Sequence, residues 1–230
     1  FAMLEMYWAY ADWRSMKDLT RELIQNAAHA VFGSHKVKHH DGRESDLGGI
    51  WREVDFYSAI SEKVGSEVTP ETKFDELKKI AHNIGLKVDP KWIHGKLAEE
   101  IFEFVYKEHL NAPTFVMGYP VDTSPLVREH RERSGIAEKW DLYVDGFELA
   151  TGYSELIDPV IQRERLVEQA KLGAKGDLEA MQVDEDFLRA MEHGMPPMGG
   201  VGMGIDRLLM ALTGLGIRET ILFPLVKPEE

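Results

Sequence analysis

Apolar side chains recur at helical spacing in several long segments of the chain. In residues 12–33 they fall three or four positions apart, and a glycine ends the run as a typical stop signal. Residues 70–84 repeat the pattern, with Thr69 as the expected cap and Pro70 in the first turn. The same criteria predict further helices over residues 51–64, 92–108, 158–172 and 184–194. We expect residues 34–110 to form a mainly helical layer or insertion without chemistry of its own.

The first eight residues alternate in the manner of a β-strand. Extended backbone places Phe1, Met3, Glu5 and Tyr7 on one face. If that face is buried, Glu5 needs a cation or a hydrogen-bond donor, because an isolated buried charge is too costly. The alternative is an edge strand on which Glu5 meets water, and the pattern leaves both interpretations open.

Residues 139–151 contain the clearest local signal, two strand-like runs joined by Asp-Gly at 145–146, which predicts a β-hairpin. A two-residue turn pairs Tyr143 with Glu148, so Asp141, two positions earlier, lies on the same face as Glu148. Two carboxylates placed in this way suit a magnesium ion, which takes one or two protein carboxylates and leaves its other positions to substrate and water. The alternative is a pair of carboxylates on a solvated face.

The side on which Glu155 lies is not settled by alternation. Counted strictly from Glu148, Glu155 falls on the opposite face. A β-bulge at Gly152 would reverse that assignment, and glycine within a strand is a typical signal of a bulge. The sequence therefore leaves the position of Glu155 relative to the hairpin carboxylates open.

Residues 199–204 hold four glycines that alternate with apolar side chains. This pattern favours a strand with one face of bare backbone, against which a flat ligand can lie. The strand runs into an apolar helix that begins with Asp206 and Arg207, so a guanidinium is available to stack on a nucleotide base or to pair with phosphates. The alternative is a packing strand followed by a surface arginine.

Composition narrows the class of protein. The chain has 230 residues, 43% of them hydrophobic, which is enough for one sizeable core. It contains no cysteine, so disulfides, thiolate metal sites and a cysteine nucleophile are excluded, and a cytoplasmic location is expected. No apolar run approaches the roughly 20 residues of a membrane span. A net charge of −13 argues against a general nucleic-acid-binding surface and favours cationic ligands.

In order along the chain, three segments resemble the carboxyl-terminal half of the catalytic domain of class II lysyl-tRNA synthetases. They are FAMLEMY at residues 1–7, FELATGYSEL at residues 147–156 and GGVGMGIDR at residues 199–207. Shorter stretches at residues 112–115, 124–126 and 221–224 also match the family's usual sequence. Each segment is weak evidence by itself, but in combination they are specific and span nearly the whole chain.

The resemblance implies an α+β fold, an antiparallel sheet of six to seven strands flanked by helices and incomplete at its amino-terminal end. This sheet would hold ATP and lysine on one face, in a single partial catalytic domain over residues 1–230. The family's positions correspond here to Phe1 and Arg207 on the two sides of the adenine, to Leu149 and Gly204 near the nucleotide, to Asp141 and Glu148 for Mg²⁺, and to Glu5, Tyr7, Thr151 and Glu155 for lysine.

The implied reaction is attack of the lysine carboxylate on the α-phosphorus of ATP, followed by transfer of the lysyl group to tRNA. This chemistry needs no protein nucleophile and works by alignment and by neutralising phosphate charge with Mg²⁺ and arginine, so the resemblance assigns catalysis to Arg207, which would neutralise charge, and to Glu148, which would hold Mg²⁺. The resemblance also implies a homodimer in the full-length protein.

Some features depart from the family pattern. Thr151 stands where an asparagine is usual, and Asp141 stands where glutamate is usual. The synthetase-like half of actinobacterial bifunctional lysyl-phosphatidylglycerol synthases is similar at Thr151, so a module of such a protein is one alternative. A synthetase paralogue that binds ligands or modifies protein lysines is another. The motif 2 arginine, motif 1 and an anticodon-binding domain have no counterpart in residues 1–230, so we expect this segment alone to be at best feebly active.

Overall fold

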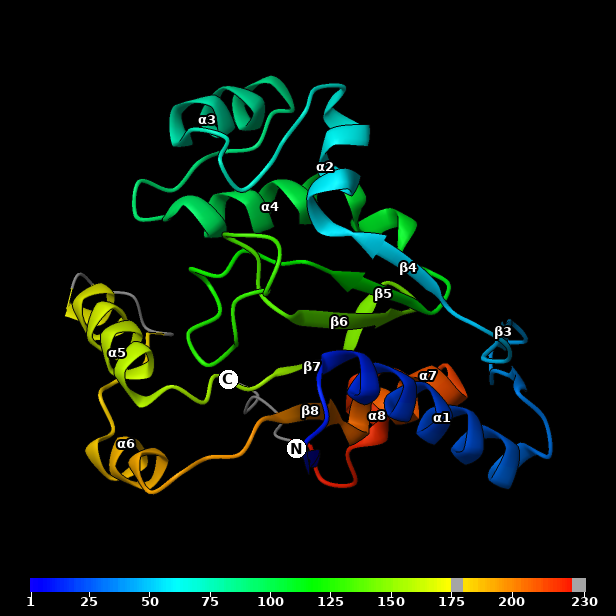
Figure 1. Cartoon of the computed structure of the whole chain (residues 1–230). Helices are drawn as coiled ribbons and strands as arrows, with labels where there is room; N and C mark the ends of the chain where they lie inside the picture. Colours follow the sequence, from blue (N-terminus) through cyan, green and yellow to red (C-terminus); the bar gives the residue numbers. More distant parts are fainter. Residues whose placement is uncertain (175–179, 225–230) are drawn as a thin grey trace, which may run out of the picture.

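A six-stranded sheet with the strand order β1-β8-β7-β6-β5-β4 forms the centre of the chain (Figure 1). The computed structural model describes residues 1–174 and 180–224. The strands of this sheet are β1 (Met3–Ala9), β4 (Arg52–Asp55), β5 (Thr114–Met117), β6 (Lys139–Val144), β7 (Phe147–Ser154) and β8 (Met198–Gly204). All neighbours are antiparallel except β4 and β5, which are parallel, so the sheet is mixed at that edge.

Helices flank both faces of the sheet, as the α+β expectation requires. They are α1 (Trp13–Phe32), α2 (Phe56–Val64), α3 (Phe74–Asn83), α4 (His94–Tyr106), the short 3₁₀ helix η1 (Lys107–His109), α5 (Pro159–Ala174), α6 (Glu185–Glu192), α7 (Ile205–Thr213) and α8 (Ile217–Thr220). A separate pair of short strands, β2 (Lys36–Lys38) and β3 (Glu44–Asp46), packs beside α7. Within the ranges described, no helix has both the length and the apolar character that a membrane span requires.

Local signals place several helix ends as expected. The Asp12 carboxylate accepts hydrogen bonds from the backbone N–H groups of Arg14 and Ser15, and α1 ends at Gly33 in the left-handed region with φ 68°. Asp158 and Asp184 likewise cap α5 and α6. These three helices need only side chains that lie next to them in the sequence.

Two predicted helices differ from the observed elements. Residues 52–55 form β4, and only residues 56–64 are helical, because pairing with β5 draws the first residues into the sheet. The helix expected over residues 70–84 begins only at Phe74. Thr69 does not cap that helix, since its hydroxyl accepts from the N–H of Glu71 within the preceding turn.

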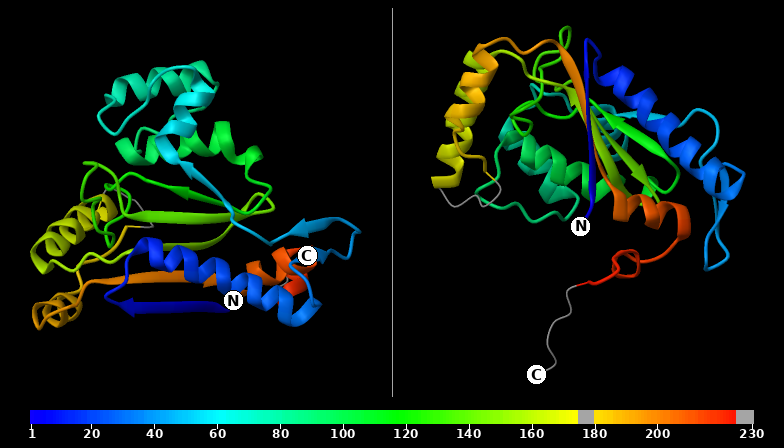
Figure 2. Two further views of the ribbon diagram at one scale, coloured as in Figure 1. Left: turned by 45° about the vertical axis from the view of Figure 1, so that its right-hand side comes forward. Right: turned by 90° about the horizontal axis from the view of Figure 1, so that it is seen from below.

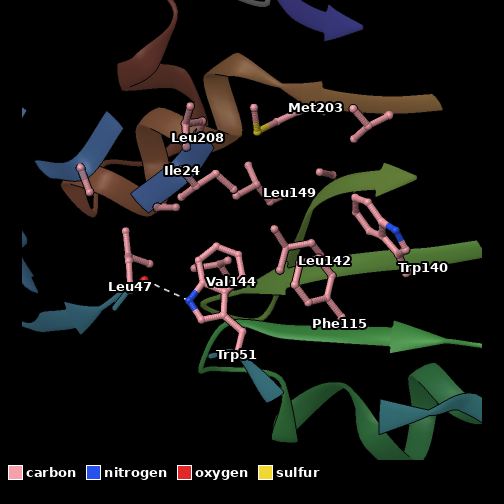
Figure 3. Close-up of a cluster of buried hydrophobic side chains, with 14 of the residues drawn as sticks. Ile24, Leu47, Trp51, Phe115, Trp140, Leu142, Val144, Leu149, Met203 and Leu208 are labelled. Atoms are coloured by element: carbon pink, nitrogen blue, oxygen red, sulfur yellow. Dashed lines mark hydrogen bonds between the residues drawn. The ribbon is translucent and has the colours of Figure 1, made fainter. Parts of the chain in front are cut away.

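Two hydrophobic cores lie on opposite faces of the sheet. One packs α1 and α7 against the face that carries Trp140, Leu142 and Met203 (Figure 3). The other packs α2, α3 and α4 against β4, β5 and the nearby part of β6. The second layer covers only this end of its face, above β5 in Figure 1. These three helices do not extend over the part of the same face formed by β1, β7 and β8, which we call the open face.

Gly152 on β7 provides a test of the first core. A Cβ at this position would lie 2.3 Å from Cζ2 of Trp140, which is fully buried. We expect Gly152→Ala to lower the free energy of unfolding by about 2 kcal/mol, because the indole cannot move without disturbing its neighbours. Urea denaturation measures this change. Gly202→Ala on neighbouring β8 is the control, since its nearest contact would be at 3.8 Å and its stability should stay near that of the wild type.

Candidate functional site

The strand register brings the three predicted site segments together on the open face. One row of residues runs across four strands, from Glu5 to Gly202, Thr151 and Asp141. A neighbouring row runs from Tyr7 to Gly200, Tyr153 and Lys139. Segments almost 200 residues apart in the sequence therefore contribute to one surface, and Figure 2 shows β1 beside β8.

A β-bulge in β7 decides which side chains share this face. The bulge lies between Glu148 and Ala150, opposite the step from Leu142 to Tyr143. Leu149 and Ala150 both point into the core and are 2% exposed, so the strand resumes its alternation one residue later. The sequence suggested a bulge at Gly152, a few residues after the observed one. The observed bulge nevertheless has the effect considered there, because it reverses the faces of the residues that follow it in β7.

The bulge has two consequences for the predicted residues. It returns Thr151 to the face of Asp141, which it opposes directly in the sheet. It also turns the Leu149 side chain into the core, so that its proximity to the nucleotide stays a prediction that could involve only its backbone. The Thr151 hydroxyl donates to the carbonyl oxygen of Trp140 at 3.4 Å.

Asp141 and Glu148 line a pocket of about 160 Å³ at the covered end of this face. Asp141 is 5% exposed, so the alternative of a solvated carboxylate is wrong for this residue, whereas Glu148 is exposed at the mouth. Partial withdrawal from water and the nearby charge of Asp141 raise the pKa of Glu148. The Asp141 Oδ1 atom is buried and has no hydrogen-bond partner in the described part of the chain.

We call this cavity, lined by Asp141 and Glu148, the acidic pocket. Its remaining walls come mainly from elements for which the sequence analysis predicted no catalytic or binding role. Helix α4 contributes Lys96, Glu99 and Glu103, and aromatic side chains close the cavity. The Thr123 hydroxyl donates to Glu99 at 2.7 Å, while burial raises the pKa of Glu99. The two glutamates are four residues apart on one helix, a pattern equally typical of a solvated face, so no sequence signal distinguished them.

The acidic pocket suits a magnesium ion in its donor set. It offers one buried, unpartnered carboxylate oxygen on Asp141 and a second carboxylate on Glu148, with room for phosphate oxygens and water. Among residues 1–174 and 180–224 there is no ready-made cluster of three or more metal-binding side chains. A metal ion here would therefore depend on ligands from outside the protein.

Glu155 forms the second chemical centre of the open face. Its side chain is 7% exposed, and Oε1 has no hydrogen-bond partner among the residues described. Burial raises the pKa of this carboxyl from 4.5 to about 7. A Cβ on Gly200 would lie 2.1 Å from that Oε1 atom and 3.2 Å from Tyr7, so the glycine makes room for the carboxylate. No ion pair joins Glu155 to a lysine, arginine or histidine within the described part of the chain, so a cationic ligand would complete the site.

Tyr7, Glu5 and Tyr153 surround the same region. The Tyr7 hydroxyl donates to Glu5 at 3.4 Å, and burial together with the charges of Glu5 and Glu155 raises the Tyr7 pKa. Tyr153, which the sequence analysis missed, lies in register with Gly200, and burial and the charge of Glu155 raise its pKa. Counting alternate residues back from Glu155 would have identified it. Because β1 is an edge strand, Glu5 is exposed, as the solvated alternative predicts.

The four glycines of β8 serve different purposes. Gly199 faces the core, where a Cβ would lie 2.5 Å from Met16, so the packing interpretation holds at this position. Gly200 accommodates Glu155, as described above. Gly202 lies on the open face with only Met3 nearby, and Gly204 immediately precedes α7. The bare surface is therefore real, but it is narrower than the glycine pattern suggested.

Arg207 and Phe1 lie at the corner where β1 meets α7. The Ala2 N–H donates to the Asp206 carboxylate at 3.0 Å, and its carbonyl accepts from Ile205 at 3.0 Å. The Arg207 guanidinium donates to the Glu148 carbonyl oxygen and remains exposed. Phe1 is 99% exposed and precedes β1, so its assignment to the adenine stays a prediction.

Comparison with known proteins places this chain among the aminoacyl-tRNA synthetases. The family described as tRNA synthetases class II (D, K and N) matches residues 1–227. A lysine–tRNA ligase of Kineococcus radiotolerans is 62% identical over 229 residues, and one of Mycolicibacterium gilvum is 56% identical over the same length. Each alignment covers 99% of this chain and 46% of the relative, so the chain spans about half the length of these proteins.

A third relative carries a different name. The lysylphosphatidylglycerol biosynthesis bifunctional protein LysX of Mycobacterium avium is 49% identical over 232 residues, which are 99% of this chain and 20% of that protein. All three alignments cover 99% of this chain. The chain belongs to the class II tRNA synthetases of the D, K and N group.

Proposed function

We propose that this chain is the part of a lysine–tRNA ligase that binds lysine, ATP and Mg²⁺ and activates lysine as lysyl-adenylate. The observation that carries the proposal is Glu155, a buried carboxylate whose Oε1 atom has no hydrogen-bond partner among residues 1–174 and 180–224 and which lies beside a strand of bare backbone. An alkylammonium group would supply the missing cation, and the glycine face leaves space for the rest of the ligand. The similarity to lysine–tRNA ligases of 62% and 56% identity supports the same ligand.

In this proposal each part of the face has a separate task. Glu155, with Tyr7 and Tyr153 beside it, binds the side-chain ammonium of lysine, and Glu5 meets the α-amino group. Gly202 and Thr151 lie in the row between Glu5 and Asp141, so a lysine carboxylate above them points towards the acidic pocket. Arg207 and Phe1 hold the adenine at the corner of the sheet.

The reaction then follows from alignment. The lysine carboxylate attacks the α-phosphorus of ATP and pyrophosphate leaves, without a covalent intermediate on the protein. Asp141 and Glu148 would hold Mg²⁺, which neutralises charge on the phosphate oxygens when it is bound. Transfer of the lysyl group to tRNA and assembly of a homodimer, in the cytoplasm, belong to the full-length protein under this proposal.

Amino-acid-dependent exchange between ATP and pyrophosphate tests this function in the full-length protein. We expect exchange with lysine and not with ornithine, arginine or glutamine. A Gly202→Val variant should lose at least about tenfold of that rate, because its side chain would occupy the bare face. Thermal unfolding checks that the variant stays folded. Exchange that prefers another amino acid, or a Gly202→Val variant with full activity, would contradict the proposal.

The second candidate is a synthetase-like module within a protein that passes the lysyl group on to a lipid. The 49% identity to LysX supports it, but the identity to lysine–tRNA ligases is higher. Both candidates share lysine activation, so the exchange assay applies to both. Assay of the full-length protein for lysyl transfer to phosphatidylglycerol separates them.

A further inference from the structure

The acidic pocket already contains a cation of its own. Lys139 lies two residues before Asp141 on β6, and its Nζ is 2.9 Å from Asp141 Oδ2. The two side chains are 19% and 7% exposed, so water screens this ion pair poorly. The Lys139 ammonium also lies 4.3 Å from the centroid of the Tyr119 ring, which holds it from a second side. Lys139 is therefore fixed in place beside the predicted metal ligand.

The pair occupies only one oxygen of Asp141. Oδ1 is buried and unpartnered within the described ranges, and it shares the pocket with three further carboxylates, those of Glu99, Glu103 and Glu148. Lys96 on the same wall is 2.9 Å from Glu100, which lies outside the pocket lining. The lining thus carries four carboxylates and two lysines, an excess of negative charge that attracts a divalent cation. Of the two lysines, Lys139 forms the ion pair with Asp141 that the structure shows.

We propose that Lys139 is a positioning residue that holds Asp141 and weakens the binding of a divalent cation to the empty pocket, so that the metal enters together with nucleotide phosphates. A fixed ammonium repels a lone dication over a few ångströms in a poorly screened cavity, but it attracts a polyphosphate. The proposal rests on the proposed function in one respect, the assignment of Asp141 and Glu148 as metal ligands. It adds a preference for the metal–nucleotide complex over the metal alone.

Binding of Mn²⁺ to the chain without nucleotide, followed by electron paramagnetic resonance of the free ion, tests this role directly. We expect weak binding to the wild type and about tenfold tighter binding to Lys139→Met, which keeps the length of the side chain and removes its charge. Lys139→Arg should bind as weakly as the wild type. Lys17→Met is the matched control, because Lys17 pairs with Glu53 far from the pocket and its loss should change nothing.

Two further variants complete the test. Adding Asp141→Asn to Lys139→Met should abolish the gain in Mn²⁺ affinity. If circular dichroism shows that Lys139→Met is unfolded, Lys139→Gln replaces it, and we expect the same tighter binding of Mn²⁺ to this variant. An unchanged or weakened Mn²⁺ affinity in the folded, uncharged variant overturns the proposal, as does tight nucleotide-free binding by the wild type. The exchange assay depends on lysine and ATP, whereas the Mn²⁺ experiment contains neither. Failure of the proposed function is therefore distinguished from failure of the proposed role of Lys139.

Discussion

Replacing Glu155 by glutamine is expected to weaken lysine binding by about 100-fold at pH 8. The variant keeps the shape of the side chain but removes the charge that would pair with the lysine ammonium in a site shielded from water. Gly200 already leaves space for a group of this size, so the effect should come from charge rather than from packing. Isothermal titration calorimetry with lysine measures both affinities.

A second buried carboxylate provides the matched control for this variant. Glu138 is 3% exposed, and one of its oxygens also has no hydrogen-bond partner among the residues that the structure describes, but it directly precedes β6 and does not line the acidic pocket. Glu138→Gln should therefore leave lysine affinity unchanged. An equal loss in both variants would point to a general effect of removing buried charge. Unchanged affinity in Glu155→Gln would show that another group binds the ammonium.

The same carboxylate should make the fold less stable as the pH rises. Its pKa is about 7 in the folded chain and 4.5 as an ordinary glutamate, so between these values the folded state binds more protons than the unfolded state. Stability from this group is present below pH 4.5, falls as the pH rises, and is lost above about pH 7. The difference amounts to about 3 kcal/mol, at 1.36 kcal/mol for each pKa unit.

Urea denaturation of the wild type and Glu155→Gln at pH 5 and pH 8 measures this effect. The free energy of unfolding of the variant, minus that of the wild type, should be about 2.5 kcal/mol larger at pH 8 than at pH 5, because only the wild type loses stability from this group as the pH rises. Comparing the two pH values cancels any constant cost of packing the amide, and comparing the two proteins cancels the other titrating groups. A difference that does not change with pH would mean that Glu155 is not strained by burial.

These two expectations describe one trade-off. A carboxylate that is buried without a partner lowers stability in the empty protein, and the same desolvation strengthens its attraction for a cationic ligand. Saturating lysine should therefore recover stability at pH 8 in the wild type and much less in the glutamine variant. Asp141 is different, because Lys139 already neutralises one of its oxygens.

The sequence predicted those parts of the fold whose signals are local. The Asp-Gly turn at 145–146 gave the correct pairing of Tyr143 with Glu148, because a two-residue turn sets the register of its hairpin. Asp12 and Asp184 located the first turns of α1 and α6 for the same reason, since a cap needs only neighbouring backbone. The resemblance to lysyl-tRNA synthetases named the family correctly.

Signals that depend on distant partners were weaker. Residues 52–55 were expected to be helical and form β4 instead, because the edge of the sheet supplies backbone partners that no local window contains. The start of α3 was misplaced by four residues, since Thr69 and Pro70 suit a turn as well as a helix. The contribution of α4 to the acidic pocket had no signal at all in the sequence.

The sequence by itself thus determined the family, the order of the site segments and the chemical types of the site residues. Only the tertiary structure decided how these residues face one another. The bulge between Glu148 and Ala150 put Thr151 on the face of Asp141, and packing around Gly200 left Glu155 buried, with one oxygen that has no hydrogen-bond partner in the described ranges. The alternation of apolar and polar residues along one strand indicates only which neighbouring side chains share a face. Burial, register across strands and unpaired charge arise when distant segments meet.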